Sequence, residues 1–263
     1  MRKPERAPSR IVVSGMGAIS ALGRGLRVIA PALESGQDGI RPIERFDMTP
    51  FLPVHLGGMV VLDVAVSAEA WAIEAAREAW ADAGLAEASP VGVPALAPGR
   101  VAVVVGTTDG EKGDIARLAR SVADALGAGG PVWTISTACS SSANALGLGR
   151  DLILEGDADV VIAGGAEALS AEMIAGFASL GVLSAEKCAP FGDTTGTTLG
   201  EGAGFVVLER EGMRDRPHRA VLSGYGLASD AWHETSPDPR GEGVTRAMLG
   251  AMTDAGITPA DVG

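Results

Sequence analysis

The chain has 263 residues and a formal net charge of −12, and its residues are 46% hydrophobic but only 4% aromatic. A strongly acidic surface repels polyanions, so nucleic acids and anionic membranes are excluded as general partners. No run of about 18 apolar residues is present, so we expect no membrane span. The composition is typical of an α/β protein with an aliphatic core.

The predicted elements alternate between strands and helices. After a basic tail at 1–9, the β-branched run 10–15 predicts a strand that ends at glycines. The segment 67–85 predicts a helix, with Ser67 as its N-cap and Gly84 at its end. Further elements are predicted in the order strand 100–108, helix 113–127, strand 132–137, helix 140–156, strand 157–165 and strand 202–210, with a looser stretch at 170–200. This alternation is typical of βαβ units and favours a mainly parallel sheet.

Two segments of the chain are repeated in the same order. "RIVVSGMGAIS" (10–20) returns as "RAVLSGYGLAS" (219–229), and "WADAGL" (80–85) returns as "MTDAGI" (252–257). Such self-similarity indicates duplication of one βα unit. We therefore expect a first half at 10–210, which contains the candidate nucleophile, and the start of an incomplete second half at 211–263.

The segment "GMGAIS" (15–20) allows an alternative interpretation as the phosphate turn of a dinucleotide-binding oxidoreductase. Ser20 replaces the third glycine of that fingerprint, and no acid-bearing strand follows at the expected distance. The motif also recurs at 224–229. A duplication explains this recurrence, whereas a single cofactor site does not.

A cysteine lies where a predicted strand meets a predicted helix. "VWTISTACSSSANALG" (132–147) places Cys139 directly before the helix 140–156. The unpaired N–H groups and the dipole at a helix N-terminus stabilise negative charge and so favour a thiolate. A thiolate is a nucleophile that needs no strong neighbouring base. The helix is nearly uncharged before Arg150, so we expect it to be buried on all sides. The alternative is a buried structural cysteine.

The other cysteine gives no comparable signal, because Cys188 lies in irregular sequence with no helix start behind it. We expect it to be structural. Two cysteines and three histidines provide neither a disulfide framework nor a metal-ligand spacing. We therefore expect no metal, no cofactor and a cytoplasmic location in which both thiols stay reduced.

The chain resembles the β-ketoacyl synthases, the condensing enzymes of the thiolase superfamily. The resemblance is most specific in "TACSSSANALGLGRDLILEGDADVVIAGGAEA" (137–168), "GFASLGVLS" (176–184) and "APFGDTTGTTLGEGAGFVVLE" (189–209). It implies a thiolase-like layered αβαβα fold, of which this chain would hold the N-terminal half plus the first βα unit of the C-terminal half. This expectation agrees with the internal repeat.

The resemblance also implies a reaction and a set of site residues. Cys139 corresponds to the nucleophile that takes an acyl group from an acyl carrier protein as a thioester, and its backbone N–H corresponds to an oxyanion donor. A malonyl extender would then lose carbon dioxide and attack that thioester. Phe177 resembles a residue that lines the acyl pocket, and His233 lies in a segment that the family places near the pocket.

The resemblance breaks at the catalytic histidines, because the family has both in the second half and the sequence stops short of the first. His55 and His218 are expected at the surface, and His233 does not match a catalytic position. We expect a split ketosynthase in which a separate C-terminal chain supplies both histidines, in an (αβ)2-type assembly paired through the strand 132–137. Truncation or cleavage of a longer chain is the alternative.

Two further expectations concern partners. A non-catalytic subunit of the chain-length-factor kind shares the fold but lacks the cysteine, so Cys139 disfavours that alternative. Acyl carrier proteins are usually acidic, and a net charge of −12 opposes their approach. Docking would then need a local basic patch, either around Arg214, Arg216 and Arg219 or on the missing second half.

Overall fold

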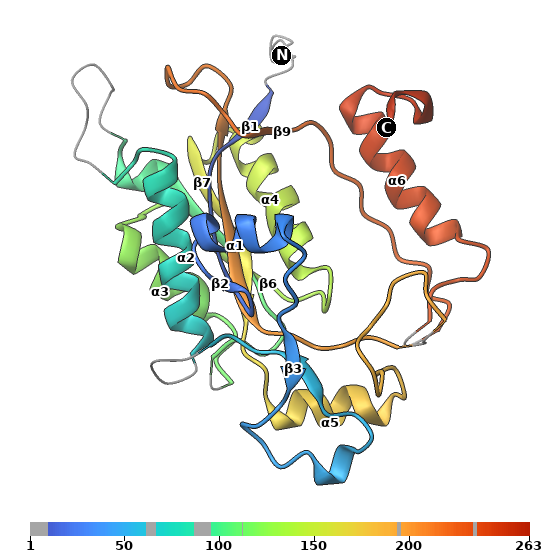
Figure 1. Ribbon diagram of the computed structural model, residues 1–263. Helices are drawn as coiled ribbons and strands as arrows, with labels where there is room; N and C mark the ends of the chain where they lie inside the picture. Colours follow the sequence, from blue (N-terminus) through green and yellow to red (C-terminus); the bar gives the residue numbers. More distant parts are fainter. Residues whose placement is uncertain (1–9, 62–66, 87–95, 112, 194–195, 234–235) are drawn as a thin grey trace.

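A mixed sheet of seven strands runs through the computed structural model, which describes residues 10–61, 67–86, 96–111, 113–193, 196–233 and 236–263 (Figure 1). The strands follow the order β2-β1-β8-β7-β5-β6, and β9 also pairs with β1. The strands are β1 (Ile11–Ser20), β2 (Gly23–Arg24), β5 (Val101–Gly106), β6 (Val132–Ile135), β7 (Val160–Glu167), β8 (Gly202–Arg210) and β9 (Ala220–Leu222), and a separate hairpin consists of β3 (Ile40–Pro42) and β4 (Leu56–Gly58). The helices are α1 (Leu26–Glu34), α2 (Ala68–Asp82), α3 (Arg117–Leu126), α4 (Ser141–Glu155), α5 (Ala171–Ser179) and α6 (Glu242–Ala255).

The expectation of a mainly parallel sheet is wrong, because four of the six strand pairings described in this sheet are antiparallel. Strand β5 is parallel to β6 and β7, but β8 is antiparallel to both β7 and β1. The chain leaves β7 at Glu167, stays at that end of the sheet through α5, and re-enters at Gly202, which pairs with Glu167. Because no helix carries the chain back to the other end, β8 must run antiparallel to β7.

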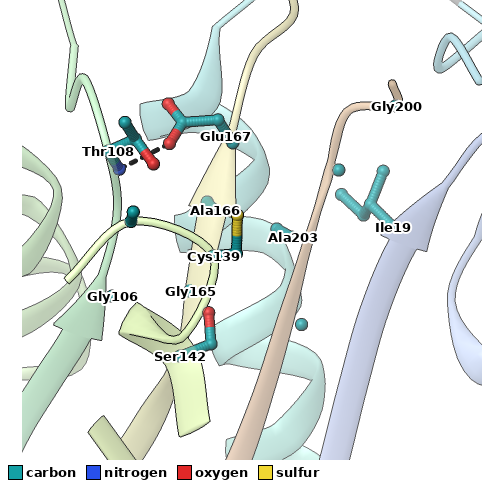
Figure 2. A pocket seen from close by; sticks show the side chains of 13 residues that line it. Ile19, Gly106, Thr108, Cys139, Ser142, Gly165, Ala166, Glu167, Gly200 and Ala203 are labelled. Atoms are coloured by element: carbon teal, nitrogen blue, oxygen red, sulfur yellow. Dashed lines mark hydrogen bonds between the residues drawn. The ribbon is translucent and has the colours of Figure 1, made fainter. Parts of the chain in front are cut away.

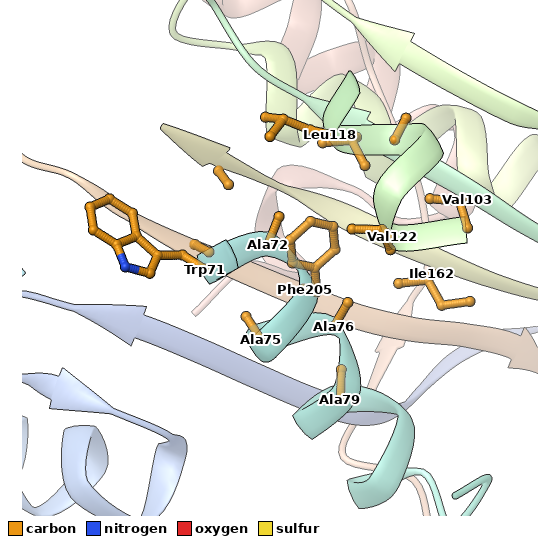
Figure 3. Close-up of a cluster of buried hydrophobic side chains, with 14 of the residues drawn as sticks. Trp71, Ala72, Ala75, Ala76, Ala79, Val103, Leu118, Val122, Ile162 and Phe205 are labelled. Atoms are coloured by element: carbon orange, nitrogen blue, oxygen red, sulfur yellow. The ribbon is translucent and has the colours of Figure 1, made fainter. Parts of the chain in front are cut away.

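Helices cover both faces of the sheet, and the alternation of side chains along β5 shows how. Val103 and Val105 pack in one cluster with α2 and α3, whereas Ala102 and Val104 pack in another with α4 (Figures 1 and 3). Trp71 is the largest buried side chain on the α2 face. A strand buried on both faces reads as a continuous apolar run, as β5 does. This arrangement agrees with the layered α/β fold expected from the sequence. Within the described ranges no helix is long and apolar enough to cross a membrane.

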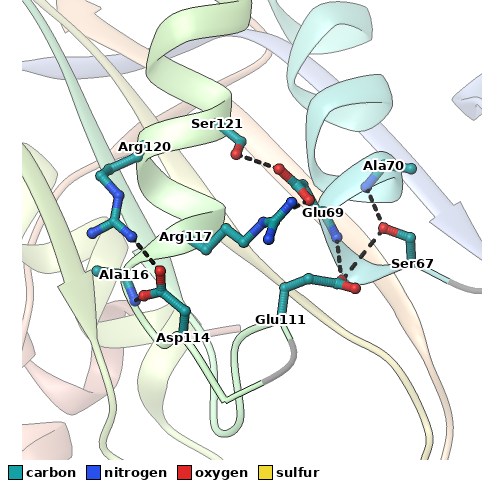
Figure 4. Close-up of polar contacts among 9 residues, drawn as sticks. All are labelled: Ser67, Glu69, Ala70, Glu111, Asp114, Ala116, Arg117, Arg120 and Ser121. Carbon is teal, nitrogen blue, oxygen red and sulfur yellow. Dashed lines mark hydrogen bonds and ion pairs between the residues drawn. The ribbon is translucent and has the colours of Figure 1, made fainter.

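Helix α2 forms where the sequence predicts it. Ser67 caps its N-terminus by accepting a hydrogen bond from the N–H of Ala70 at 3.1 Å, and Gly84 follows its end with a left-handed φ of 68°. The Glu111 carboxylate also accepts from the N–H of Glu69, so two side chains satisfy the free amides of the first turn (Figure 4). Glu69 in turn forms an ion pair with Arg117 of α3 and fixes the two helices together.

Several described elements have no counterpart among the predicted ones. They include α1, β2, the β3–β4 hairpin, and α5, which lies inside the stretch 170–200 that is expected to be irregular. Helix α5 has a recognisable start, because Ser170 accepts a hydrogen bond from the N–H of Met173 at 3.1 Å. Helix α5 is short and apolar and lacks the alternation of apolar and charged residues by which a helix is recognised in a sequence.

The two sequence repeats have the same local geometry. A Cβ atom at Gly15 would lie 2.2 Å from the carbonyl oxygen of Ala79 in α2, and one at Gly224 would lie 2.3 Å from that of Ala251 in α6. In both copies a glycine therefore lets a strand or extended segment touch a helix backbone.

The aspartates of the two repeats bind equivalent amides. Asp82 accepts from the N–H of Met16 at 3.0 Å, and Asp254 accepts from the N–H of Tyr225 at 2.9 Å. The repeated "DAG" and "GMG/GYG" residues thus bind each other in each copy, which explains why they recur together.

The arginines proposed as a docking patch are mostly neutralised. The Arg214 side chain is only 6% exposed, pairs with Glu209 at 2.7 Å and donates to the carbonyl of Ala83. Arg219 pairs with Asp82. The charges of Arg214 and Arg219 hold the segment after β8 against the end of α2. Arg216 forms no ion pair with any described residue, and the docking patch stays a prediction.

Candidate active site

Cys139 lies on a strained turn between β6 and α4. The preceding residue, Ala138, has a φ of 53°, a left-handed conformation that costs a non-glycine residue about 1–3 kcal/mol. Ser141 encloses the turn, since its hydroxyl donates to the carbonyl of Ala138 and accepts from the N–H of Thr137. The thiol is exposed, and the N–H of Cys139 has no hydrogen-bond acceptor among the described residues. The turn therefore presents a thiol and a free amide together.

Two glycines let the start of α4 rest directly on the sheet. A Cβ at Gly106, the last residue of β5, would lie 2.5 Å from the amide of Ser142. One at Gly165 of β7 would lie 2.1 Å from the hydroxyl oxygen of the same serine. A larger residue at either position would push α4 away from the sheet, so these glycines determine how close Cys139 lies to the ends of β5 and β7.

Cys139 opens into a pocket of about 440 Å³ (Figure 2). Most of the residues that line it are glycine or alanine, so the backbone of the wall can lie close to a bound molecule. The lining residues are Ile19, Gly106, Thr108, Ala138, Cys139, Ser142, Gly165, Ala166, Glu167, Gly200, Gly202, Ala203 and Gly204. They come from β1, from β5 and the loop after it, from the turn before α4 and the start of that helix, from β7, and from β8 and the residues just before it, so distant segments converge on the thiol.

One carboxyl group stands in this wall. Glu167 accepts from the N–H of Thr108 at 2.6 Å and from the hydroxyl of Thr107 at 3.3 Å, which holds the loop after β5 against the end of β7. Burial raises the pKa of Glu167, while these hydrogen bonds oppose that shift. The Oε2 oxygen braces the loop against the strand end, whereas the Oε1 oxygen is buried without a hydrogen-bond partner among the described residues.

A second carboxylate, Glu201, anchors the opposite wall. Its side chain is completely buried and forms two hydrogen bonds with Arg45, at 3.0 and 2.5 Å. It also accepts from the amides of Val60 and Leu169. Glu201 lies between the lining residues Gly200 and Gly202, so this ion pair fixes their position.

The other residues singled out in the sequence do not meet Cys139. Phe177 is half-buried on α5, and His233 is exposed and accepts from the N–H of Ser236 at 3.3 Å. Neither lines the pocket, so their part in substrate binding stays a prediction. The expectation of an all-round buried α4 is wrong at its first turn, where Ser142 and Ala143 are exposed.

The remaining cysteine and histidines lie elsewhere as well. His218 is exposed and His55 half-buried, and the ring Nδ1 of His55 lies 2.8 Å from the carbonyl oxygen of Pro53. Cys188 is half-buried in the loop after α5. No cluster of three or more metal-binding side chains occurs among the described residues.

The glycines of "GMGAIS" have a packing role. A Cβ at Gly17 would lie 2.1 Å from the carbonyl oxygen of Ala75, and Gly15 meets Ala79 in the same way. Helix α2 therefore fills the space in which a dinucleotide would need to place its phosphates. This geometry opposes the oxidoreductase alternative.

Sequence reasoning missed the two carboxylates that shape the pocket. Glu167 ends an otherwise apolar strand, and Glu201 interrupts a glycine-rich run. An isolated acid in apolar surroundings is a signal for a buried, hydrogen-bonded carboxylate, which could have identified both. Their partners, Thr108 and Arg45, are too distant in sequence to be inferred.

Comparisons with known proteins agree on one family. A model of the β-ketoacyl synthase N-terminal domain matches residues 115–212. A 3-oxoacyl-[acyl-carrier-protein] synthase 2 from Staphylococcus aureus (strain COL) is 35% identical, over 96% of this chain and 71% of the relative.

Solved structures give the same result. A structure described as the ishigamide ketosynthase/chain length factor matches with a TM-score of 0.87 at 30% identity, over 97% of this chain and 72% of that one. A type II polyketide synthase acyl-carrier protein in complex with its ketosynthase bound to the hexaketide matches with a TM-score of 0.85 at 26% identity, over 97% of this chain and 72% of that chain. The identity and coverage show that this chain belongs to the β-ketoacyl synthase family of condensing enzymes, with their thiolase-like layered fold.

Proposed function

We propose that this chain is the nucleophile-bearing subunit of a ketosynthase. The Cys139 thiolate attacks the thioester of an acyl group on an acyl carrier protein, and the carrier thiolate leaves and takes up a proton. A malonyl extender then loses carbon dioxide, and the resulting carbanion attacks the Cys139 thioester. The new carbon–carbon bond forms as the cysteine thiolate leaves, so the acyl chain gains two carbons.

The observation that supports this proposal is the placement of Cys139. A strained turn exposes the thiol at the N-terminus of α4, beside a free amide and a pocket of small residues. The amide of Cys139 can donate to the oxyanion that forms when the sulfur attacks a thioester. A merely structural cysteine would need none of these features.

Thioester formation tests the first step. The protein is incubated with a carrier protein that bears a short acyl group, and the intact mass is measured. We expect an adduct on the wild type and on Cys188→Ala, which is the matched control, and none on Cys139→Ala. Equal labelling of both variants would contradict the proposal and would favour a subunit of the chain-length-factor kind.

The second step needs groups that the described pocket lacks. None of the three histidines lies among the residues that line it. We propose that a separate C-terminal chain supplies the two histidines of the family, as the split-ketosynthase interpretation predicts. Residues 211–263 would begin the second half of the fold, and the separate chain would complete it.

An uncovered face of α6 supports this part of the proposal. Val244 and Met248 are 49% and 60% exposed, whereas Ala72 and Ala76, which occupy the equivalent positions of α2, are fully buried. In the first copy the sheet and α3 cover those positions. A second sheet of the same kind would cover α6 in the same way, and exposed apolar side chains of this size favour such a contact.

Co-expression with a histidine-bearing C-terminal half tests the split. We expect the two chains to co-elute in gel filtration and to release carbon dioxide from a malonyl carrier only together. Release of carbon dioxide by this chain alone would contradict the split, while thioester formation would still report on Cys139. The acyl carrier protein as partner and the cytoplasmic location stay predictions.

A further inference from the structure

The turn that holds Cys139 is tied to α4 by side-chain hydrogen bonds. The amide Nδ2 of Asn144 donates to the Oγ1 of Thr137 at 2.7 Å. The hydroxyl of Ser140 donates to the carbonyl oxygen of Thr137 at 2.8 Å. Thr137 and Ser140 flank Ala138 and Cys139, so these bonds close the strained turn from both sides.

Asn144 is itself held from a distant part of the chain. The hydroxyl of Tyr225 donates to the Oδ1 of Asn144 at 2.6 Å, which fixes the side-chain amide with its Nδ2 towards Thr137. Tyr225 belongs to the second copy of the internal repeat, and its own N–H donates to Asp254 at the end of α6. Asp254 also pairs with Arg150 of α4 at 2.8 Å.

The packing of the tyrosine ring explains how it reaches Asn144. A Cβ atom at Gly147 would lie 2.5 Å from the ring of Tyr225, so only glycine at this position of α4 admits the ring. Burial raises the pKa of Tyr225, which keeps the hydroxyl protonated and able to donate. The ring and the hydroxyl therefore have separate roles, one in packing and one in orienting the amide.

We propose that Tyr225 and Asn144 are positioning residues for the nucleophile, acting through Thr137 to hold Cys139 in its strained turn. That this positioning serves acyl transfer rests on the proposed function, whereas the hydrogen bonds that hold Cys139 do not depend on it. A residue of the second repeat thus controls the geometry of a thiol in the first half.

The strain at Ala138 gives the hydrogen bonds a specific task. A left-handed non-glycine residue relaxes to an ordinary conformation unless its surroundings prevent it. Without the Tyr225 hydroxyl, the Asn144 amide can rotate and release Thr137. The turn can then relax, and the Cys139 sulfur moves away from the N-terminus of α4, whose unpaired N–H groups and dipole attract negative charge.

The rate of alkylation by iodoacetamide tests the proposal in the full chain. Tyr225→Phe keeps the ring on Gly147 and removes only the hydroxyl. We expect the second-order rate constant at Cys139 to fall about fivefold, the size of one hydrogen bond's net contribution. Cys188 in the same molecule provides the internal reference and should keep its rate. Ser35→Ala, which removes a hydroxyl hydrogen bond at the end of α1, should change neither rate.

A second variant shows whether the effect passes through Thr137. Thr137→Val removes the acceptor of Asn144 without changing side-chain shape, and we expect it to slow Cys139 as well. The double variant Tyr225→Phe/Thr137→Val should be no slower than Thr137→Val, because both changes interrupt one pathway. Additive slowing would overturn the relay.

An unchanged rate at Cys139 in Tyr225→Phe would also overturn it, and so would equal changes at Cys139 and Cys188, which indicate general loosening. Because alkylation needs no acyl donor, this result is independent of thioester formation. If the wild type formed no thioester while Tyr225→Phe still slowed alkylation, the proposed function would fail and the relay would stand.

Discussion

Replacement of Glu201 by glutamine probes the ion pair that supports one wall of the pocket. The carboxylate accepts four hydrogen bonds, two from Arg45 at 3.0 and 2.5 Å and one each from the amides of Val60 and Leu169 at 3.0 and 2.9 Å. Glutamine keeps one oxygen acceptor but neutralises the charge. Arg45, whose side chain is 21% exposed, then loses its counter-charge in a largely buried site.

The expected loss of stability follows from this burial. Removing one partner of a buried ion pair costs about 3–5 kcal/mol, and the partial exposure of Arg45 favours the lower end, about 3 kcal/mol. For a chain of this size each kcal/mol lowers the Tm by roughly 2–4 °C, so the Tm of Glu201→Gln should fall by roughly 6–12 °C. The double variant Glu201→Gln/Arg45→Met leaves no unpaired charge and should recover part of that loss.

Thermal unfolding followed by circular dichroism measures both variants. We expect the Tm loss of the double variant to be smaller than the sum of the two single losses, with a coupling of about 2 kcal/mol. A Glu201→Gln protein that melts within about 2 °C of the wild type would refute the reasoning. Strict additivity would show that Arg45 and Glu201 do not depend on each other.

Two further changes test the packing and the charge of the fold. Gly106→Ala places a Cβ 2.5 Å from the amide of Ser142, so we expect the free energy of unfolding to fall by about 1–3 kcal/mol and Cys139 to be labelled more slowly. Gly99→Ala is the control, because a Cβ there has no atom within 4 Å, and it should melt like the wild type. The hydrogen bond from Arg219 lowers the pKa of Asp82. The ionised carboxylate therefore contributes its full share of the folding stability above the unfolded-state pKa, and this contribution is lost as pH falls through the folded-state pKa. The difference in unfolding free energy between wild type and Asp82→Asn should therefore shrink below about pH 4, and a constant difference across that range would contradict the assignment.

Local signals in the sequence predict the elements that place Cys139. The apolar run of β5, the Ser67 cap of α2 and the small residues after Cys139 each depend on neighbours along the chain, and the structure confirms these elements. The repeat predicts a second βα unit, and in the structure Gly224 and Gly226 meet α6 as Gly15 and Gly17 meet α2.

Contacts between distant segments could not be predicted in the same way. The bond between Tyr225 and Asn144, and that between Arg45 and Glu201, depend on how helices stack on the sheet. The antiparallel direction of β8 depends on the path of the loop after α5, which has no periodic pattern. Arg214 shows the same limit, since a charged residue in a polar loop is expected at the surface but is buried by its partner Glu209.

The most direct test of Cys139 as the acyl acceptor is to locate the adduct after reaction with an acyl carrier thioester. Tandem mass spectrometry of the digested protein should find the acyl group on the peptide that contains Cys139. Treatment with hydroxylamine should remove it, as expected for a thioester. An acyl group that resists hydroxylamine or is found only on Cys188 would contradict the proposed nucleophile.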